Sequence, residues 1–181
     1  MKKISVVIVV KNEEKNISRC LNSVKWADEI LVVDTGSTDR TREICRSFPC
    51  RLIEREWTGF GPTKKWAVEQ AENDWVLSLD ADEEVSASLR RKMDDLLQDD
   101  QSAAGYRIRR RSYYLGKVIR HSGWDHDFPL RLFNRTYGNF NQKAIHESVT
   151  LKGRIEKISE PVIHYPYPEI GTHLQKIDHY A

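Results

Sequence analysis

Short apolar runs alternate with helical patterns along the first half of the chain. The runs at residues 4–10, 30–33 and 75–79 hold few polar positions, as expected for strands that are covered on both faces. Between the first two runs, apolar positions at residues 17–24 recur at the spacing of one helix face. This alternation predicts an α/β fold with a mainly parallel sheet and helices on both of its faces.

Polar residues before the helical patterns predict where the helices begin. We expect Asn12 to cap the first helix and Ser86 to cap the helix that follows the run at 75–79. Ser37 or Thr38 is expected to cap the second helix. In each case the side-chain oxygen would accept a hydrogen bond from an N–H group that the helix leaves without a partner.

Beyond about Ala103 the pattern changes. Tyr106 and Ile108 alternate with arginines, which is typical of a half-exposed strand, and the later segments are short and interrupted by glycine. This part is expected to form antiparallel or mixed strands laid against the first half. The residues from Ile170 to the end have the pattern of an amphipathic helix.

Length and composition place the chain among soluble globular proteins. It has 181 residues, of which 39% are hydrophobic and 31% are charged, so a single domain over 1–181 is expected. No apolar run approaches the ~18 residues of a membrane helix, which excludes integral membrane proteins. The net charge of +2 gives no reason to expect a nucleic-acid partner. Three cysteines without close pairing favour a reducing, cytoplasmic setting.

Acidic residues stand at the ends of two predicted strands. Asp34 follows the second strand, and Asp80 and Asp82 follow the fourth. Because the carboxyl ends of parallel strands border the ligand crevice, these carboxylates are expected to face one cleft. Residues two apart on an extended chain project to one side, so Asp80 and Asp82 suit a Mg²⁺ or Mn²⁺ ion on a diphosphate. The alternative is an acidic loop that leads into a helix N-terminus.

The turn that starts at Asp34 also has two interpretations. Asp34 can accept hydrogen bonds from a base or ribose, while Gly36 lets a ligand approach closely. A turn followed by a helix cap at Ser37 explains the same residues without a ligand.

Histidines and arginines in the second half are weaker signals. His121 and His126 flank Trp124 in a polar loop, where substrate contact and a purely structural role are equally plausible. His146 and Glu147 resemble half of a zinc-protease motif, but the second histidine is missing and that activity is rejected. The arginine-rich segment at 107–120 is typical of a solvated strand face, and it would also suit an anionic lipid or a phosphorylated acceptor.

Taken together, these segments resemble a known family. Residues 5–13, 28–41 and 79–83 are similar to family 2 glycosyltransferases of the GT-A (Rossmann-like) fold. Four further motifs resemble the bacterial lipopolysaccharide-core β-glucosyltransferase subgroup: Trp57-x-Gly59-Phe60-Gly61, His121-Ser122-Gly123-Trp124, Arg131-Leu132-Phe133 and His146-Glu147. The resemblance covers nearly the whole chain, with a nucleotide-sugar-binding half at 1–102 and an acceptor-side half at 103–181.

The resemblance implies transfer of a hexose such as glucose, with inversion at the anomeric carbon. The implied donor is a UDP-sugar, and the implied cofactor is Mg²⁺ or Mn²⁺. The implied acceptor is a hydroxyl of a cell-envelope glycan or lipid-linked molecule such as lipopolysaccharide core. Peripheral contact with the anionic inner face of the cytoplasmic membrane fits this activity.

The resemblance also assigns residues. Asp34 would hold uridine, and Asp80 and Asp82 would lie at the metal. Glu147 would be the catalytic base, with Asp127 as runner-up; the plainer interpretation of Glu147 is a strand-end residue paired with an arginine. The nucleotide-sugar site would comprise Val10, Asn12, Glu13, Asp34, Gly36, Ser37, Lys64, Asp80, Ala81 and Asp82. The acceptor or diphosphate would contact His121, Trp124, Arg131 and His146, although Arg131 in an alternating strand could face water.

The chain departs from the family pattern at three points, and two other functions are considered. Thr35 replaces a second aspartate, His126 stands where proline is common, and the family usually continues past Ala181, which favours a C-terminally truncated chain. A phosphohydrolase with an aspartate nucleophile ranks low, because its acidic pair would follow the first strand. A non-catalytic or truncated nucleotide-sugar or glycan-binding module is the main alternative.

Overall fold

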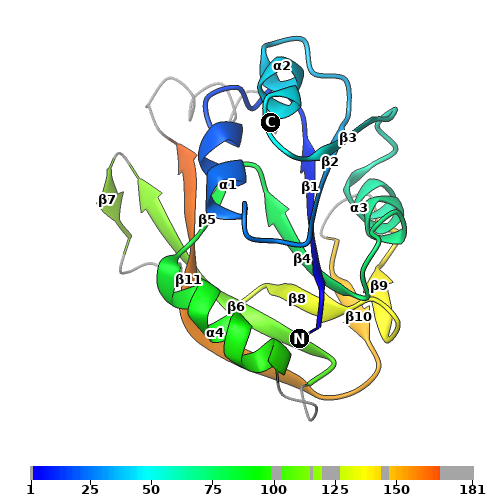
Figure 1. Ribbon diagram of the computed structural model, residues 1–181, viewed down its shortest axis with the longest axis vertical. Coiled ribbons are helices and arrows are strands. Elements are labelled where there is room, and N and C mark those ends of the chain that lie inside the picture. The colour runs from blue at the N-terminus through cyan, green and yellow to red at the C-terminus, as the bar shows by residue number, and fades with distance from the viewer. Residues whose placement is uncertain (1, 99–102, 115, 120–126, 144–146, 168–181) are drawn as a thin grey trace.

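The central feature of the fold is one large mixed sheet. The structure is a computed structural model that describes residues 2–98, 103–114, 116–119, 127–143 and 147–167. Within these residues, nine strands form the sheet, in the order β3-β2-β1-β4-β8-β6-β11-β5 with β7 beside β6 (Figure 1). None of the described helices is long and apolar enough to cross a bilayer.

The first half of the chain builds the parallel part of the sheet. Strands β2 and β4 lie on either side of β1 and parallel to it, and β3 extends the sheet beyond β2. The strands are β1 (Ile4–Val10), β2 (Glu29–Asp34), β3 (Arg51–Glu54) and β4 (Trp75–Asp80). The predicted parallel α/β sheet is therefore confirmed.

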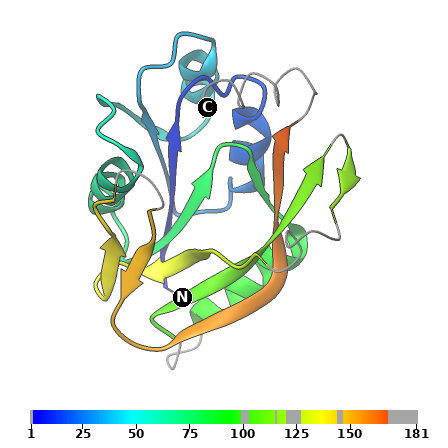
Figure 2. The same cartoon turned by 180° about the vertical axis from the view of Figure 1, so that it is seen from behind.

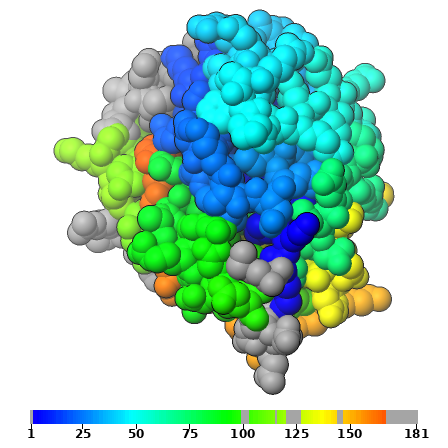
Figure 3. All heavy atoms as spheres, viewed as in Figure 1, coloured from blue at the N-terminus to red at the C-terminus, as the bar shows by residue number. Residues whose placement is uncertain are grey.

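Helices cover both faces of this sheet. Successive residues of β1 point to opposite sides: Ile8 packs into a core with helices α1, α2 and α4, whereas Val7 packs with α3. Figures 1 and 2 show α3 at one side of the molecule, apart from α1 and α4, and the atoms of α1, α2 and α4 lie on the face seen in Figure 3. The helices are α1 (Ile17–Ser23), α2 (Thr41–Arg46), α3 (Phe60–Glu69) and α4 (Ala87–Gln98).

The second half is mixed, which is one of the two expected arrangements. Strand β8 runs antiparallel to both β4 and β6, whereas β6 and β11 are parallel, and β5 joins β11 antiparallel at the far edge. These strands are β5 (Glu83–Val85), β6 (Gly105–Tyr114), β7 (Lys117–Val118), β8 (Leu130–Asn134) and β11 (Ile155–Tyr167). A separate antiparallel hairpin consists of β9 (Gly138–Phe140) and β10 (Val149–Leu151).

Two of the predicted helix caps are wrong, and one is confirmed. Helix α1 begins at Ile17, and Asn12 instead has a left-handed backbone (φ 54°) in the preceding loop. Helix α2 begins at Thr41, whose N–H donates to Asp39 rather than to Ser37 or Thr38. Ser86 caps α4 as expected, since its Oγ accepts a hydrogen bond from the N–H of Leu89.

Two further expectations concern segments beside these elements. Glu83 and Glu84 are not an acidic helix N-terminus, because they form strand β5 and pair with β11. The C-terminal helix predicted from Ile170 lies outside the described residues.

Candidate active site

Three of the parallel strands end at one edge of the sheet. Val10 at the end of β1 lies opposite Asp34 at the end of β2, and Val9 lies opposite Asp80 at the end of β4. The structure therefore brings Asp34 and Asp80 to the same edge, on either side of β1. This is the edge where ligands bind in open α/β sheets.

Asp34 carries an unused hydrogen-bond acceptor. The side chain is fully buried, and its Oδ1 accepts hydrogen bonds from the N–H groups of Gly36 (3.1 Å) and Ser37 (3.0 Å). Gly36 has φ 93°, a conformation that residues with a Cβ seldom adopt. The other oxygen, Oδ2, is buried and has no partner in the described part of the chain. Because an unsatisfied buried acceptor is costly, an N–H donor from a ligand would stabilise this site.

A contact between two loops holds the Asp34 turn in place. The N–H of Asn12 donates to Ser37 Oγ at 2.9 Å, and Asn12 Oδ1 accepts from the N–H of Thr38 at 2.7 Å. The next residue, Glu13, donates its N–H to Thr41 Oγ1 at 2.8 Å. The candidate residues Asn12, Glu13 and Ser37 thus join the β1–α1 loop to the β2–α2 loop.

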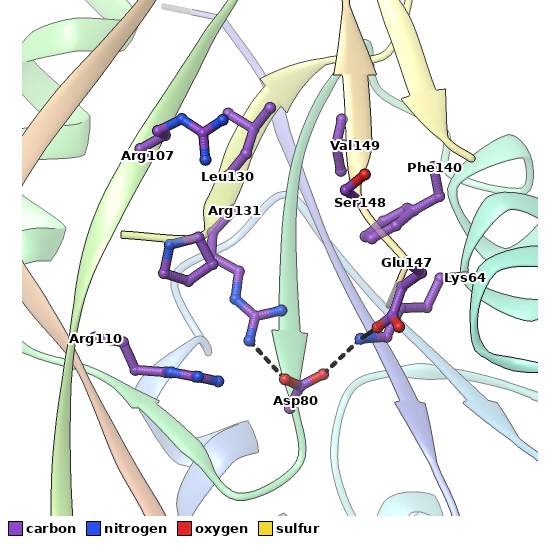
Figure 4. A pocket seen from close by; sticks show the side chains of 11 residues that line it. Lys64, Asp80, Arg107, Arg110, Leu130, Arg131, Phe140, Glu147, Ser148 and Val149 are labelled. Carbon is purple, nitrogen blue, oxygen red and sulfur yellow. Dashed lines mark hydrogen bonds and ion pairs between the residues drawn. The ribbon is translucent and has the colours of Figure 1, made fainter. Parts of the chain in front are cut away.

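Asp80 lies at the centre of a charged cluster. Its Oδ1 is 2.9 Å from Lys64 Nζ, and its Oδ2 is 2.5 Å from Arg131 Nη2 (Figure 4). Lys64 also contacts Glu147 Oε1 at 2.9 Å, and Arg131 contacts Glu83 Oε1 at 2.6 Å. Arg131 is buried and lines the cavity, so the alternative interpretation, that it faces water, is wrong. Glu147 pairs with a lysine rather than an arginine.

The cluster holds its members in their charged forms to different degrees. Burial lowers the pKa of the Lys64 ammonium, but Asp80 and Glu147 outweigh it and raise that pKa above its usual value. Burial raises the pKa of the Asp80 carboxyl, but the nearby Arg131 and Lys64 bring it well below its usual value. For Glu83, burial dominates and its pKa is raised despite Arg131.

A close approach of two backbones brings Lys64 and Glu147 together. The N–H of Gly61, in the first turn of α3, donates to the carbonyl oxygen of Lys143 at 3.1 Å. A Cβ at position 61 would press against the backbone oxygens of Asn141 and Lys143, far inside van der Waals contact. The segment that leads toward Glu147 therefore lies directly against the helix that carries Lys64.

Asp82 is separate from this cluster. Its Oδ2 lies 3.5 Å from His164 Nε2, and the other ring nitrogen of His164 is 3.0 Å from Ser112 Oγ. The described residues contain no group of three or more His, Cys, Asp and Glu side chains that could hold a metal ion by themselves. Ala81, between the two aspartates, is buried.

A cavity of about 260 Å³ opens beside the Asp80 cluster. Helix α3 contributes Lys64 to its wall, β6 contributes Arg107 and Arg110, and the β9–β10 hairpin contributes apolar side chains (Figure 4). Glu147 also lines it, which puts the preferred candidate base next to space for a substrate. Asp127, the runner-up, is paired with Arg110 at 2.5 Å.

Some candidate residues lie outside the described part of the chain, and some residues of the site were not predicted. His121, Trp124 and His146 lie outside the described residues. Sequence reasoning did not single out Glu83 as the partner of Arg131, Arg110 as the partner of Asp127, or His164 as the neighbour of Asp82. No local motif marks these contacts, because each joins residues far apart in the chain.

Comparison with known proteins identifies the family. The model of Glycosyl transferase family 2 matches residues 5–159, so the chain belongs to that family. The lipopolysaccharide core biosynthesis glycosyltransferase LpsC of Rhizobium meliloti (strain 1021) is 30% identical over 158 residues, which are 84% of this chain and 58% of LpsC. An uncharacterized glycosyltransferase of Rickettsia typhi, RT0209, is 32% identical and is matched by 100% of this chain over 66% of its own length. The chain thus spans less than two thirds of either relative.

Solved structures show the same fold. S. aureus TarS 1-349 in complex with UDP matches 92% of this chain and 61% of its own, with a TM-score of 0.69 at 19% identity. TarS 1-349 in complex with UDP-GlcNAc matches 66% of this chain and 37% of its own, with a TM-score of 0.54 at 26% identity. The expected GT-A fold is confirmed.

Proposed function

We propose that this chain binds a UDP-sugar and transfers its sugar to a hydroxyl group with inversion. The observation that carries the proposal is the single edge at which the strands end in Asp34 and Asp80, with a cavity lined by Glu147 beside it. Family membership and the similarity to TarS, which was solved with UDP and with UDP-GlcNAc, support it.

The nucleoside is proposed to bind at the Asp34 turn. The buried Oδ2 of Asp34 lacks a donor, and the N–H group of a uracil ring can supply one. Gly36 keeps the turn free of side-chain bulk, and the contact between Asn12 and Ser37 holds it against β1. The other proposed contacts to the nucleotide sugar are Val10, Glu13 and Ala81.

Asp82 and His164 fit a divalent cation better than Asp80 does. Both oxygens of Asp80 are taken by cations, whereas Asp82 faces an imidazole nitrogen. Ser112 holds the other nitrogen of that ring, as groups next to metal-bound histidines commonly do. With phosphate oxygens as further ligands, this pair suits Mn²⁺ or Mg²⁺. When bound, the ion would neutralise charge on the departing diphosphate.

Glu147 is the proposed general base. Lys64 holds its Oε1, and its Oε2 has no hydrogen bond within the described residues, so that oxygen can accept the proton of an acceptor hydroxyl. Inversion needs one such base on the side opposite the leaving group. Asp80 and Lys64 act as positioning residues, because they fix Glu147 relative to the end of β4.

The acceptor is proposed from the similarity to LpsC. A cell-envelope glycan or lipid-linked molecule such as lipopolysaccharide core fits that relative, with glucose or a related hexose as the transferred sugar. A lipid-linked acceptor would place the reaction at the inner face of the cytoplasmic membrane.

Calorimetric titration with UDP tests the donor site. We expect Mn²⁺ to tighten UDP binding to the wild-type chain and EDTA to reverse the effect. Asp82→Asn should lose about 10-fold to 100-fold in Mn²⁺-dependent affinity, because it removes a ligand charge. The exposed Asp95→Asn on α4 is the matched control and should bind as the wild type does. Full metal-dependent binding by Asp82→Asn would show that the ion lies elsewhere.

Turnover in the same preparation separates an enzyme from a binding module. UDP release from UDP-glucose, with an acceptor extract, should fall at least about 100-fold in Glu147→Gln. UDP affinity should stay within about twofold, and the exposed Glu69→Gln should release UDP at the wild-type rate. Wild-type binding without any release would favour the non-catalytic alternative.

A further inference from the structure

Positive charge gathers on one wall of the cavity. The lining includes four cationic side chains but only two carboxylates, Asp80 and Glu147. Those two carboxylates, with Glu83 beneath them, are already paired with Lys64 and Arg131. The other two cations of the lining are the arginines of β6: Arg107, and Arg110, which pairs with Asp127 outside the lining.

These two arginines keep free N–H groups. Arg107 Nη1 donates to the carbonyl oxygen of Phe128 at 3.3 Å, and no carboxylate pairs with Arg107 in the part of the chain that the structure describes. Arg110 binds Asp127 through Nε (2.7 Å) and Nη2 (2.5 Å), but its Nη1 lies 3.9 Å from Glu83, beyond hydrogen-bond reach. A guanidinium has five N–H donors, so both side chains can still bind an anion.

Both arginines of β6 reach the same cavity, beside irregular pairing of β6 with its two neighbouring strands. On a regular strand, residues three apart point to opposite faces. The pairing of β6 with β8 shifts between Tyr106 and Arg107, and the pairing of β6 with β11 shifts beyond Ile108. Both Arg107 and Arg110 nevertheless line the cavity, on the side opposite Glu147 and Lys64 (Figure 4).

We propose that the acceptor is a sugar that carries an anionic group, a phosphate ester or a carboxylate, and that Arg107 and Arg110 bind this group. The proposal rests on the proposed function and extends it to the acceptor. Guanidinium groups match the geometry of phosphate and carboxylate oxygens. Leu130, Phe140 and Val149 supply apolar surface for the sugar ring, and the anion on the arginine side leaves an acceptor hydroxyl toward Glu147.

The test is a set of titrations of the full chain, each with and without saturating UDP and Mn²⁺. The probes are glucose 6-phosphate, glucuronate and glucose, which share a ring and differ in charge. We expect one or both of the charged sugars to bind at least about tenfold tighter than glucose, the effect of a charge-assisted hydrogen bond. Arg107→Gln should remove most of that preference without changing UDP affinity. Arg111→Gln, on the same strand but outside the cavity lining, is the control and should keep it.

The outcomes separate this proposal from the donor proposal. If UDP binds but glucose binds as tightly as both charged sugars, the acceptor proposal is wrong while the donor site stands. If Arg107→Gln weakens UDP instead of the charged sugars, Arg107 serves the donor and the acceptor proposal is again wrong. If UDP fails to bind but the preference for charge persists and depends on Arg107, the anion site stands and the proposed transferase activity does not.

Discussion

The Asp34 turn and the Asp80 cluster stand at the ends of β2 and β4, the two parallel strands that flank β1, yet they stabilise their carboxylates in different ways. Asp34 is held by the neutral backbone N–H groups of Gly36 and Ser37. Asp80 is held by two cations, Lys64 from α3 and Arg131 from β8.

The difference shows what each region depends on. The Asp34 turn is local, and the loss of one hydrogen bond leaves the other contacts in place. The Asp80 cluster alternates positive and negative charges, so removal of one cation leaves buried or partly buried carboxylates without compensation. The four predictions below test this contrast by unfolding in urea, in order of expected effect.

Arg131→Met should be the most destabilising change. It leaves the fully buried Glu83 and one oxygen of Asp80 without their cation, and we expect a loss of about 3–5 kcal/mol in the free energy of unfolding. The control is Arg135→Met. The Arg135 guanidinium binds backbone carbonyl oxygens of Asn73 and Glu69, so its removal should lower the free energy of unfolding by about 1 kcal/mol. Equal losses of unfolding free energy in the two variants would contradict the view that the Asp80 cluster depends on its buried cation.

Lys64→Met should cost less, because its partners are partly exposed. The side chains of Asp80 and Glu147 are 33% and 18% accessible, so water replaces part of the lost interaction, and we expect about 1–3 kcal/mol. Lys65→Met, next to it on α3, is the control and should change stability by under about 0.5 kcal/mol.

The effect of Lys64 should also depend on pH. Because its pKa is raised in the folded chain, its stabilising contribution is present below the unfolded value, about pH 10, and is lost as the pH rises through the higher folded value. The difference between the wild type and Lys64→Met should therefore stay constant from about pH 6 to about pH 10 and shrink above it. A difference that shrinks below about pH 9 would contradict the assignment.

Ser37→Ala should have the smallest effect. It removes the acceptor of the Asn12 N–H, a loss of about 1 kcal/mol or less because Asn12 is exposed and its N–H can bind solvent instead. Ser47→Ala, an exposed serine at the end of α2, should change stability by under about 0.5 kcal/mol. A loss as large as that of Lys64→Met would show that the turn is not the more tolerant region.

The same contrast explains what could be predicted from the sequence. The strands that end at Asp34 and Asp80 follow from continuous apolar runs, because local pattern is enough to define a buried strand. The pairs of Arg131 with Glu83 and of His164 with Asp82 could not be predicted, since sequence spacing carries no signal for contacts between distant strands. The parallel pairing of β6 with β11 was missed for the same reason.

The incorrect helix caps have a related cause. Asn12 has a suitable side chain for a cap, but its side-chain oxygen, Oδ1, instead accepts a hydrogen bond from the N–H of Thr38 in the neighbouring loop. Local preference for a cap is weak enough that a contact between two loops overrides it. The cap at Ser86 could be predicted because no such competing contact involves it in the described residues.

Gly61 has a consequence for how this site can vary. Since the first turn of α3 touches the backbone near Lys143 with no room for a Cβ at position 61, any larger residue would force α3 away from the segment that precedes Glu147. The distance between the two backbone segments that carry Lys64 and Glu147 is thus limited by main chain, so substitutions of the side chains around them leave that distance unchanged.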